Sequence, residues 1–128
     1  MSPVPGLPDL VFTANAALIH HNMAILSRFA HPERRGEERY DLGWLEERGF
    51  HVVRLPGGAF FEGAGDALFC GDTLFAGYRI RSQAIAHQEL AAMLDCRVIP
   101  LELIDPYCYH LDTCFCPLAP DVALYYPG

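Results

Sequence analysis

The sequence predicts an α/β fold built from a repeated ββαβ unit. Two segments share the same order of apolar strands, turns and one helix, and a third segment begins in the same way. The closing strands of the first two units match at Val52 and Val98, which are 46 residues apart. Repeats of this length are typical of arrays and closed rings, because one unit cannot bury its sheet face alone. The alternative is an ordinary α+β domain that is regular by chance.

The first unit spans about residues 11–56. Tyr40 and Trp44 lie four residues apart in its predicted helix, which suits a packed face. Gly49 fits the position that follows a helix end. The expected elements are a strand at 11–20, a turn at 20–22, a strand at 23–29, a polar loop at 31–38, a helix at about 37–48 and a closing strand at 50–56.

The second unit, about residues 60–104, repeats this order, and a third begins at 109 and runs to 128. In the second helix Ala86, Leu90 and Met93 form one apolar stripe, and Ser82 is placed to cap it. We therefore expect residues 1–128 to form one partial domain. The expected elements are strands at 66–70, 74–79 and 96–104 with a helix at about 83–94, then strands at 110–118 and 122–126 without a following helix.

Composition and charge exclude several classes of protein. The net charge of −7 argues against a nucleic-acid surface, which needs a basic stripe. No apolar run reaches the roughly 20 residues of a membrane span, and the N-terminus lacks the features of a secretory signal. Five cysteines, an odd number, favour free thiols in a reducing compartment. We therefore expect a cytoplasmic protein without nucleic-acid or membrane partners.

Three polar residues, Asn15, Glu62 and His110, occupy matching places in the three units, 47 and 48 residues apart. In a ring of repeats the equivalent strand starts converge on the axis, so these side chains would meet. A carboxylate can orient an imidazole and stabilise its charged form, and the imidazole can then transfer protons near neutral pH. We expect Glu62 and His110 to be catalytic. The alternatives are a solvated loop carboxylate and an ordinary hydrogen-bonded histidine.

Two further carboxylates are candidates for substrate binding. Strand alternation would place Asp112 on the same face as His110. There it could hold a planar guanidinium through two parallel hydrogen bonds. Asp66 follows the flexible segment 63–65 and either binds substrate or braces the turn.

The arginines give a weaker signal. Arg79 and Arg81 flank a predicted strand of the second unit, and Arg81 is the candidate for binding a substrate carboxylate, although surface arginines are common. Arg28, Arg34 and Arg35 lie near or within the polar loop and are expected to be solvated, as loop arginines usually are.

A zinc site is a competing interpretation, because Cys108, His110, Cys114 and Cys116 lie within nine residues. The pattern lacks the paired knuckles of a structural zinc site, and Cys114 and Cys116 suit small buried hydrophobes better. We expect no metal and no cofactor.

These residues also resemble a known family. The segments FTANAAL, LSRFAHPERRGEE, FFEGAGDALF, GYRIRS and YHLDTCFCPL are similar, in this order, to the guanidine-modifying (pentein) superfamily. Within it, the similarity is to the dimethylarginine dimethylaminohydrolase and amidinotransferase proteins. It extends over nearly the whole chain from about residue 7, and EGAGD followed by HLDT is its specific part. The resemblance implies a five-bladed α/β-propeller of ββαβ units, of which this chain would supply about two and a half.

The resemblance also implies covalent catalysis. In that family a cysteine thiolate attacks an amidine or guanidine carbon and expels an amine or ammonia, and water or an acceptor amine releases the product. Glu62 matches the acid of the triad, His110 the proton-transferring base and Asp112 the carboxylate that grips the guanidinium. The main expectation is a C–N hydrolase that converts dimethylarginine to citrulline and an amine.

Two departures keep other possibilities open. Asn15 stands where many members have a guanidine-binding aspartate, and succinylarginine dihydrolases are similar in having TANAA there. An amide both accepts and donates, which fits a substrate that loses both nitrogens. An arginine or succinylarginine dihydrolase, or an amidinotransferase, therefore remains possible.

The second departure is that no cysteine here matches the family's nucleophile, which lies near the C-terminus of a longer chain, and the first blade is also missing. We therefore expect residues 1–128 alone to be an inactive fragment or remnant, or to need a complementing chain or a homodimer. The alternative from another class is a non-catalytic repeat domain that binds a partner along its exposed sheet edge.

Overall fold

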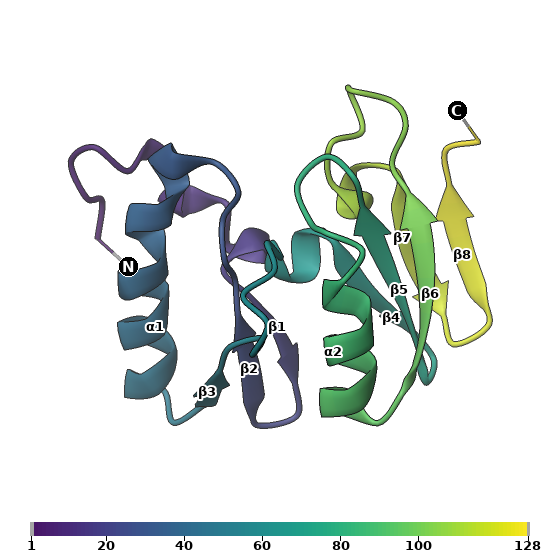
Figure 1. Ribbon diagram of the computed structural model, residues 1–128, viewed down its shortest axis with the longest axis horizontal. Coiled ribbons are helices and arrows are strands. Elements are labelled where there is room, and N and C mark those ends of the chain that lie inside the picture. The colour runs from purple at the N-terminus through teal and green to yellow at the C-terminus, as the bar shows by residue number, and fades with distance from the viewer. Residues whose placement is uncertain (1, 128) are drawn as a thin grey trace.

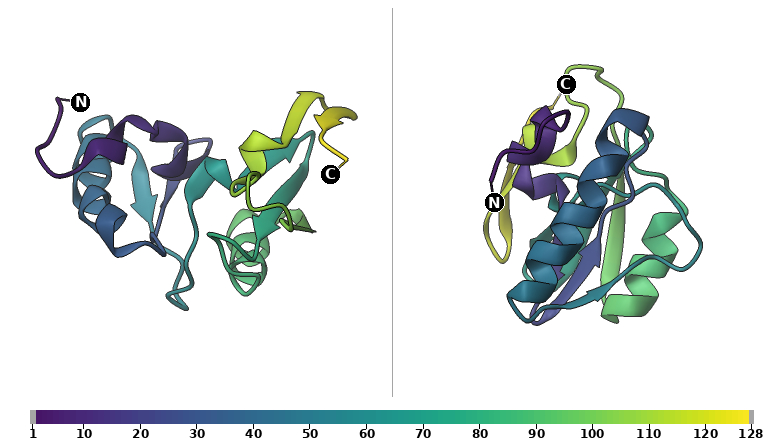
Figure 2. Two further views of the ribbon diagram at one scale, coloured as in Figure 1. Left: turned by 90° about the horizontal axis from the view of Figure 1, so that it is seen from above. Right: turned by 90° about the vertical axis from the view of Figure 1, so that its left-hand side faces the viewer.

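The computed structural model describes residues 2–127, in which two ββαβ units are followed by a β-hairpin (Figure 1). Figure 2 shows the first unit and the final hairpin at opposite ends of the molecule. The strands are β1 (Ala17–His20), β2 (Met23–Leu26) and β3 (His51–Val53) in the first unit, β4 (Ala67–Cys70), β5 (Thr73–Tyr78) and β6 (Arg97–Glu102) in the second, and β7 (Phe115–Ala119) and β8 (Val122–Tyr125) in the hairpin.

Both units have the same sheet topology. In each, the first two strands form an antiparallel hairpin and the third strand pairs with the second in parallel. The sheet orders are β1-β2-β3 and β4-β5-β6, and β7 pairs with β8 in a separate two-stranded sheet. The ββαβ order expected from the sequence is therefore present twice.

Residues 2–127 contain two α-helices, α1 (Glu38–Glu47) and α2 (Ala86–Leu94). Helix α1 ends at Glu47 with Arg48 as its C-cap, and Gly49 adopts a φ of +82°, which confirms the predicted stop. The prediction that Ser82 caps α2 was wrong. The helix begins at Ala86, and the Ser82 hydroxyl is instead bonded to the Glu62 amide and the Asp66 carboxylate.

The chain enters each hairpin through a short 3-10 turn rather than through a longer strand. Only the last four residues of the expected strand 11–20 are extended, because residues Pro8–Val11 and Thr13–Asn15 form 3-10 helices. The equivalent turns in the other units are Gly63–Gly65 and Leu111–Thr113. An apolar run without strict alternation does not distinguish a strand from such a turn.

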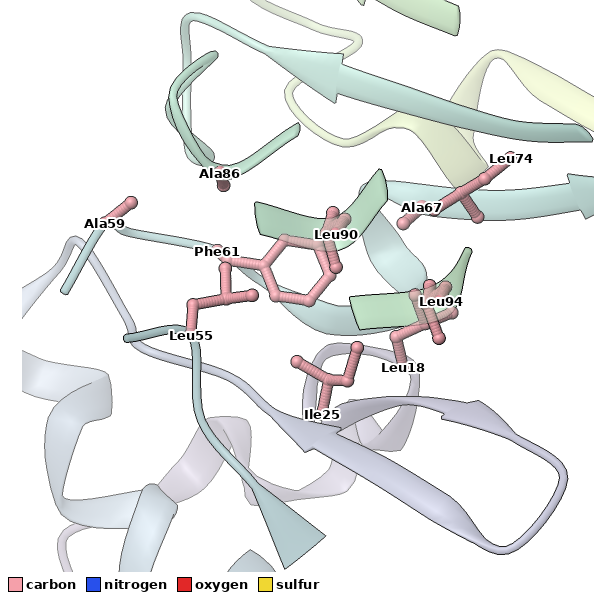
Figure 3. Close-up of a cluster of buried hydrophobic side chains, with 10 residues drawn as sticks. All are labelled: Leu18, Ile25, Leu55, Ala59, Phe61, Ala67, Leu74, Ala86, Leu90 and Leu94. Atoms are coloured by element: carbon pink, nitrogen blue, oxygen red, sulfur yellow. The ribbon is translucent and has the colours of Figure 1, made fainter. Parts of the chain in front are cut away.

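The first sheet is covered by a helix on each face. Successive residues of β2 point to opposite sides, so Ile25 packs in the cluster that contains α2, whereas Ala24 and Leu26 pack in the cluster with Leu45 of α1. Figure 3 shows Leu90 of α2 beside Phe61 in the first of these clusters. Burial of each such side chain contributes about 1.5–3 kcal/mol. No helix among the described residues is long and apolar enough to cross a membrane.

Candidate active site

The three 3-10 turns come together in the middle of the molecule. The turn at Thr13–Asn15 contacts the turn at Gly63–Gly65, which in turn contacts the turn at Leu111–Thr113. Asn15 ends the first turn, while Glu62 and His110 directly precede the other two. All three side chains are buried. The repeat therefore brings the three matching positions to one place, as the sequence predicted.

Two glycines make this close approach possible. Gly63 has a φ of +59°, and a Cβ there would lie 2.9 Å from backbone atoms of Ala17. A Cβ on Gly65 would lie 2.1 Å from Nδ2 of Asn15 and 3.6 Å from Cδ2 of His110. A side chain at Gly63 would press on the backbone at Ala17, and one at Gly65 would displace the Asn15 side chain, so the glycines of the EGAGD segment have a steric role.

Glu62 and His110 form a direct pair. Nε2 of His110 lies 2.6 Å from Oε2 of Glu62, and Nη1 of Arg81 donates to the same oxygen at 3.1 Å. Burial alone would raise the pKa of Glu62, but the hydrogen bond and charge of His110, with the charges of Arg81 and Arg34, hold it below its ordinary value. Glu62 is therefore a carboxylate at neutral pH. Because Nε2–H donates to it, Nδ1 is the His110 nitrogen left for proton transfer.

The second oxygen of Glu62 is in a different situation. Oε1 is buried and has no hydrogen-bond partner among residues 2–127. A buried acceptor left unpaired costs about 1–3 kcal/mol. A hydrogen-bond donor that reached this oxygen would remove that cost.

Asp66 is fully buried and is not part of the cleft wall. It accepts hydrogen bonds from the Ser82 hydroxyl at 2.5 Å and the Leu111 amide at 3.1 Å. Burial raises the pKa of Asp66 to about 6, against the hydrogen bond from Ser82 and the charge of His110. Of the two interpretations that the sequence allowed, these contacts match a carboxylate that braces the turn.

The cleft next to the pair has a volume of about 520 Å³. Asp112 and His110 both line it, although the reason given from strand alternation was wrong, because Asp112 lies in a 3-10 turn. Burial raises the pKa of Asp112, and the charge of His110 opposes that shift. The other lining residues are Asp9, Phe12, Thr13, Ala14, Asn15, Arg34, Arg81, Tyr109 and Thr113.

Arg34 was expected to be solvated, and that expectation was wrong. Its side chain is buried, with Nε and Nη2 donating to the two oxygens of Glu37 at 3.0 and 2.8 Å, and Nη1 donating to Oδ1 of Asn15 at 3.0 Å. Burial alone would lower the pKa of Arg34, but the bond to Glu37 and nearby carboxylates raise it above its ordinary value. The arginine–glutamate spacing of three residues, typical of a helical ion pair, is the signal that could have revealed this contact.

Of the two arginines in this segment, Arg81 lines the cleft and Arg79 does not. Arg81 lies over the ring of Tyr109, with its guanidinium carbon 5.1 Å from the ring centroid, while it holds Glu62. Arg79 pairs with Glu102 on the surface. Arg81 is therefore the arginine of this pair that a ligand in the cleft could touch.

The five cysteines are free thiols, and none of them lines the cleft. The Cys114 thiol donates to the carbonyl oxygen of Leu111, and burial together with Cys108 raises its pKa. Within the part of the chain that the structure describes, no group of His, Cys, Asp and Glu is placed to hold a metal ion.

Known proteins resemble this chain along its whole length. The sequence profile described as N,N dimethylarginine dimethylhydrolase, eukaryotic, matches residues 2–128. The chain is 54% identical to the bifunctional arginine dihydrolase/ornithine cyclodeaminase ArgZ of Synechocystis, in an alignment that covers 99% of this chain and 18% of ArgZ. It is 42% identical to the N(G),N(G)-dimethylarginine dimethylaminohydrolase of Mycobacterium tuberculosis, where the alignment covers 99% of this chain and 41% of that protein.

Solved structures agree with these matches. The N-terminal domain of cyanobacterial ArgZ, crystallised as a cysteine-to-serine mutant bound to substrate, superposes with a TM-score of 0.93 at 54% identity, over 98% of this chain and 47% of that one. A dimethylarginine dimethylaminohydrolase in an adduct with a chlorinated pyridine superposes with a TM-score of 0.80 at 26% identity, over 96% and 50%. The chain thus spans about half of these domains, and less than half of the curated relatives.

Proposed function

Since the chain belongs to the N,N-dimethylarginine dimethylhydrolase family, we propose that the complete protein is an arginine dihydrolase, which removes both terminal nitrogens from the guanidino group of arginine. The observation that carries this proposal is the buried Glu62–His110 pair, whose histidine lines a cleft together with Asp112 and Asn15. Greater identity to arginine dihydrolases than to a dimethylarginine hydrolase supports arginine as the substrate. The original expectation of dimethylarginine becomes the second candidate.

The fold in this proposal is part of a closed ring. The two ββαβ units and the hairpin would be about half of a five-unit α/β-propeller, and their turns would form one side of its central cleft. Covalent catalysis needs a thiolate, and the cysteines described here lie away from the cleft. The remaining units of the complete protein would therefore supply the nucleophile from the opposite side.

The charges of the cleft suit a ligand with a cationic end and an anionic end. Asp112, which lines the cleft, would hold the guanidinium through parallel hydrogen bonds. Arg81 uses one nitrogen on Glu62 and has further N–H groups for the substrate carboxylate. Asp66 has a supporting role in this scheme, because it ties the turn that follows His110 to Ser82.

The proton transfers follow from this arrangement. The thiolate would attack the guanidino carbon, and His110 would give its Nδ1 proton to the amine that leaves as ammonia. His110 would then take a proton from the water that attacks the carbon, which breaks the carbon–sulfur bond and leaves a ureido group. A second hydrolysis would yield ornithine, carbon dioxide and another ammonia. Glu62 would stabilise the charged imidazole at each transfer.

Asn15 distinguishes this reaction from removal of a single nitrogen. After the first hydrolysis the reacting carbon carries an oxygen, which needs a hydrogen-bond donor. An amide can donate to that oxygen, whereas a carboxylate in the same place would repel it. The asparagine therefore favours retention of the ureido intermediate and its second hydrolysis.

The test uses the complete protein with arginine, citrulline and dimethylarginine as separate substrates. We expect ornithine and ammonia from arginine, and slower release of dimethylamine from dimethylarginine. Faster dimethylamine release would favour the second candidate, which the family match and the mycobacterial relative support. Absence of turnover on every guanidine would contradict both, and would favour a non-catalytic binding domain.

A further inference from the structure

The buried ion pair between Arg34 and Glu37 lies next to the site, and its arginine also contacts Asn15. Arg34 and Glu37 are 6% and 2% exposed. The arginine uses Nε and Nη2 on the two carboxylate oxygens, at 3.0 and 2.8 Å, so the plane of the guanidinium is fixed. This leaves Nη1, which points to Oδ1 of Asn15 at 3.0 Å.

This contact determines which way the Asn15 amide faces. A guanidinium donates hydrogen bonds and accepts none, so the atom it meets must be the oxygen of the amide. The NH₂ group therefore lies on the other side. That side faces Gly65 and His110, since a Cβ on Gly65 would fall 2.1 Å from Nδ2 of Asn15 and 3.6 Å from Cδ2 of His110.

We propose that Arg34, held in its plane by Glu37, is a positioning residue that keeps the NH₂ group of Asn15 turned toward the reacting carbon, and so controls whether the ureido intermediate stays for the second hydrolysis. This inference rests on the proposed arginine dihydrolase function. It assigns to Arg34 and Glu37 an effect on the choice of product in addition to their contribution to the fold.

The two hydrolytic steps should respond differently to the amide. A guanidinium has N–H donors and no acceptor, so the NH₂ group of Asn15 cannot form a hydrogen bond with it. The ureido group has a carbonyl oxygen, which does gain from it. If the side-chain amide of Asn15 rotated by about 180°, its oxygen would face the ureido oxygen. The two oxygens would repel each other, and the intermediate would dissociate more readily. Loss of the arginine contact should therefore slow the second step more than the first.

Arg34→Lys is the informative variant. Lysine keeps the charge but has a single nitrogen, which cannot hold both oxygens of Glu37 and Oδ1 of Asn15 in the same geometry. Glu37→Gln is a milder second variant, because it keeps the shape of the side chain and removes its charge. The matched control is Arg54→Lys, which alters a more exposed arginine–glutamate pair with Glu38, also at 2.8 Å.

The measurement is the ratio of free citrulline to ornithine formed from arginine by the complete protein, with kcat/KM for arginine and for citrulline. We expect Arg34→Lys to raise the ratio about tenfold, and to lower kcat/KM for citrulline about tenfold more than for arginine, as loss of one oriented hydrogen bond predicts. Glu37→Gln should act in the same direction, and Arg54→Lys should leave the ratio unchanged.

An unchanged ratio in a folded Arg34→Lys protein, or an equal loss with both substrates, would overturn the inference while leaving the proposed function intact. An inert wild-type protein would instead contradict the proposed function. If neither variant folds, a crystal structure of the wild-type complete protein tests the inference. Contact between Arg34 and Oδ1 of Asn15 would support it, whereas separation beyond hydrogen-bond distance would overturn it.

Discussion

Glu62 and His110 are 48 residues apart in the chain, yet Oε2 of the first lies 2.6 Å from Nε2 of the second, and Glu62 is fully buried. The contact exists because equivalent turns of successive ββαβ units meet, and Gly65 leaves room for them. The low pKa of Glu62 keeps the carboxylate charged, which stabilises a protonated imidazole. In our proposal the fold thereby prepares the histidine for proton transfer before any substrate is bound.

The Glu62 carboxylate is expected to be essential for turnover. Glu62→Gln keeps the shape of the side chain but removes the charge that stabilises protonated His110, so kcat on arginine should fall about 100-fold or more in the complete protein. Glu102→Gln, which alters the exposed partner of Arg79, is the control and should retain activity. Equal rates for both variants would contradict a catalytic role for Glu62.

Gly65→Ala is expected to damage the site without unfolding the protein. The added methyl group would fall on Nδ2 of Asn15 and near the His110 ring, so these side chains must move, and kcat/KM should drop at least about tenfold. Gly43→Ala is the matched control, since a Cβ there meets nothing within 4 Å. Because Gly43 lies in helix α1, this substitution should raise the free energy of unfolding by at most about 1 kcal/mol. Normal kinetics for Gly65→Ala would show that the close approach is unimportant.

Asp112→Asn is expected to weaken substrate binding more than the chemical step. The change removes the charge of the carboxylate that we assign to the guanidinium, while Glu62 and His110 keep their contact. KM for arginine should rise by about tenfold to 100-fold, with a smaller change in kcat. Steady-state kinetics measure both constants. A fall in kcat alone, with KM unchanged, would place Asp112 outside the binding site.

Stability should depend on pH through Asp41, which is buried in α1. Burial and the charge of Glu37 raise the pKa of Asp41 to about 6, against the charge of Arg34. The native state thus binds this proton more tightly than the unfolded chain. Stability from this group is complete below its unfolded pKa and decreases as pH rises through about 6.

The measurement for Asp41 is urea unfolding of the wild type and Asp41→Asn at pH 4 and pH 8. Asparagine removes the titration, so the variant should lose less stability than the wild type between the two pH values, by an amount on the order of 2 kcal/mol. Asp121→Asn changes an exposed aspartate and serves as the control. Parallel pH profiles for wild type and Asp41→Asn would contradict the raised pKa.

Much of the fold was accessible from the sequence because local patterns determine it. Helical spacing predicted α1, and Gly49 predicted its end. The repeat spacing also predicted that Glu62 and His110 would meet, since equivalent positions of stacked units converge. These predictions follow from the helical and repeat periodicity of the sequence and from the assumption that the units are arranged in a ring.

The remaining features depend on contacts between distant segments. Ser82 looked like a helix cap, but its hydroxyl meets Asp66 and the amide of Glu62, which a local pattern cannot reveal. Arg34 was expected to be solvated because its neighbours are polar, yet its side chain is buried, pairs with Glu37 and donates a hydrogen bond to Asn15. The sequence alone led us to expect dimethylarginine as the substrate, whereas our proposal, which uses the identity to known relatives, is arginine.

The most direct test of the central claim is a double-mutant cycle on ammonia release from arginine by the complete protein, with Glu62→Gln, His110→Gln and the double variant. If the two residues act as one proton-transfer unit, the double variant should be about as slow as the slower single variant. Losses that multiply would show that the two residues act independently, and would contradict the account.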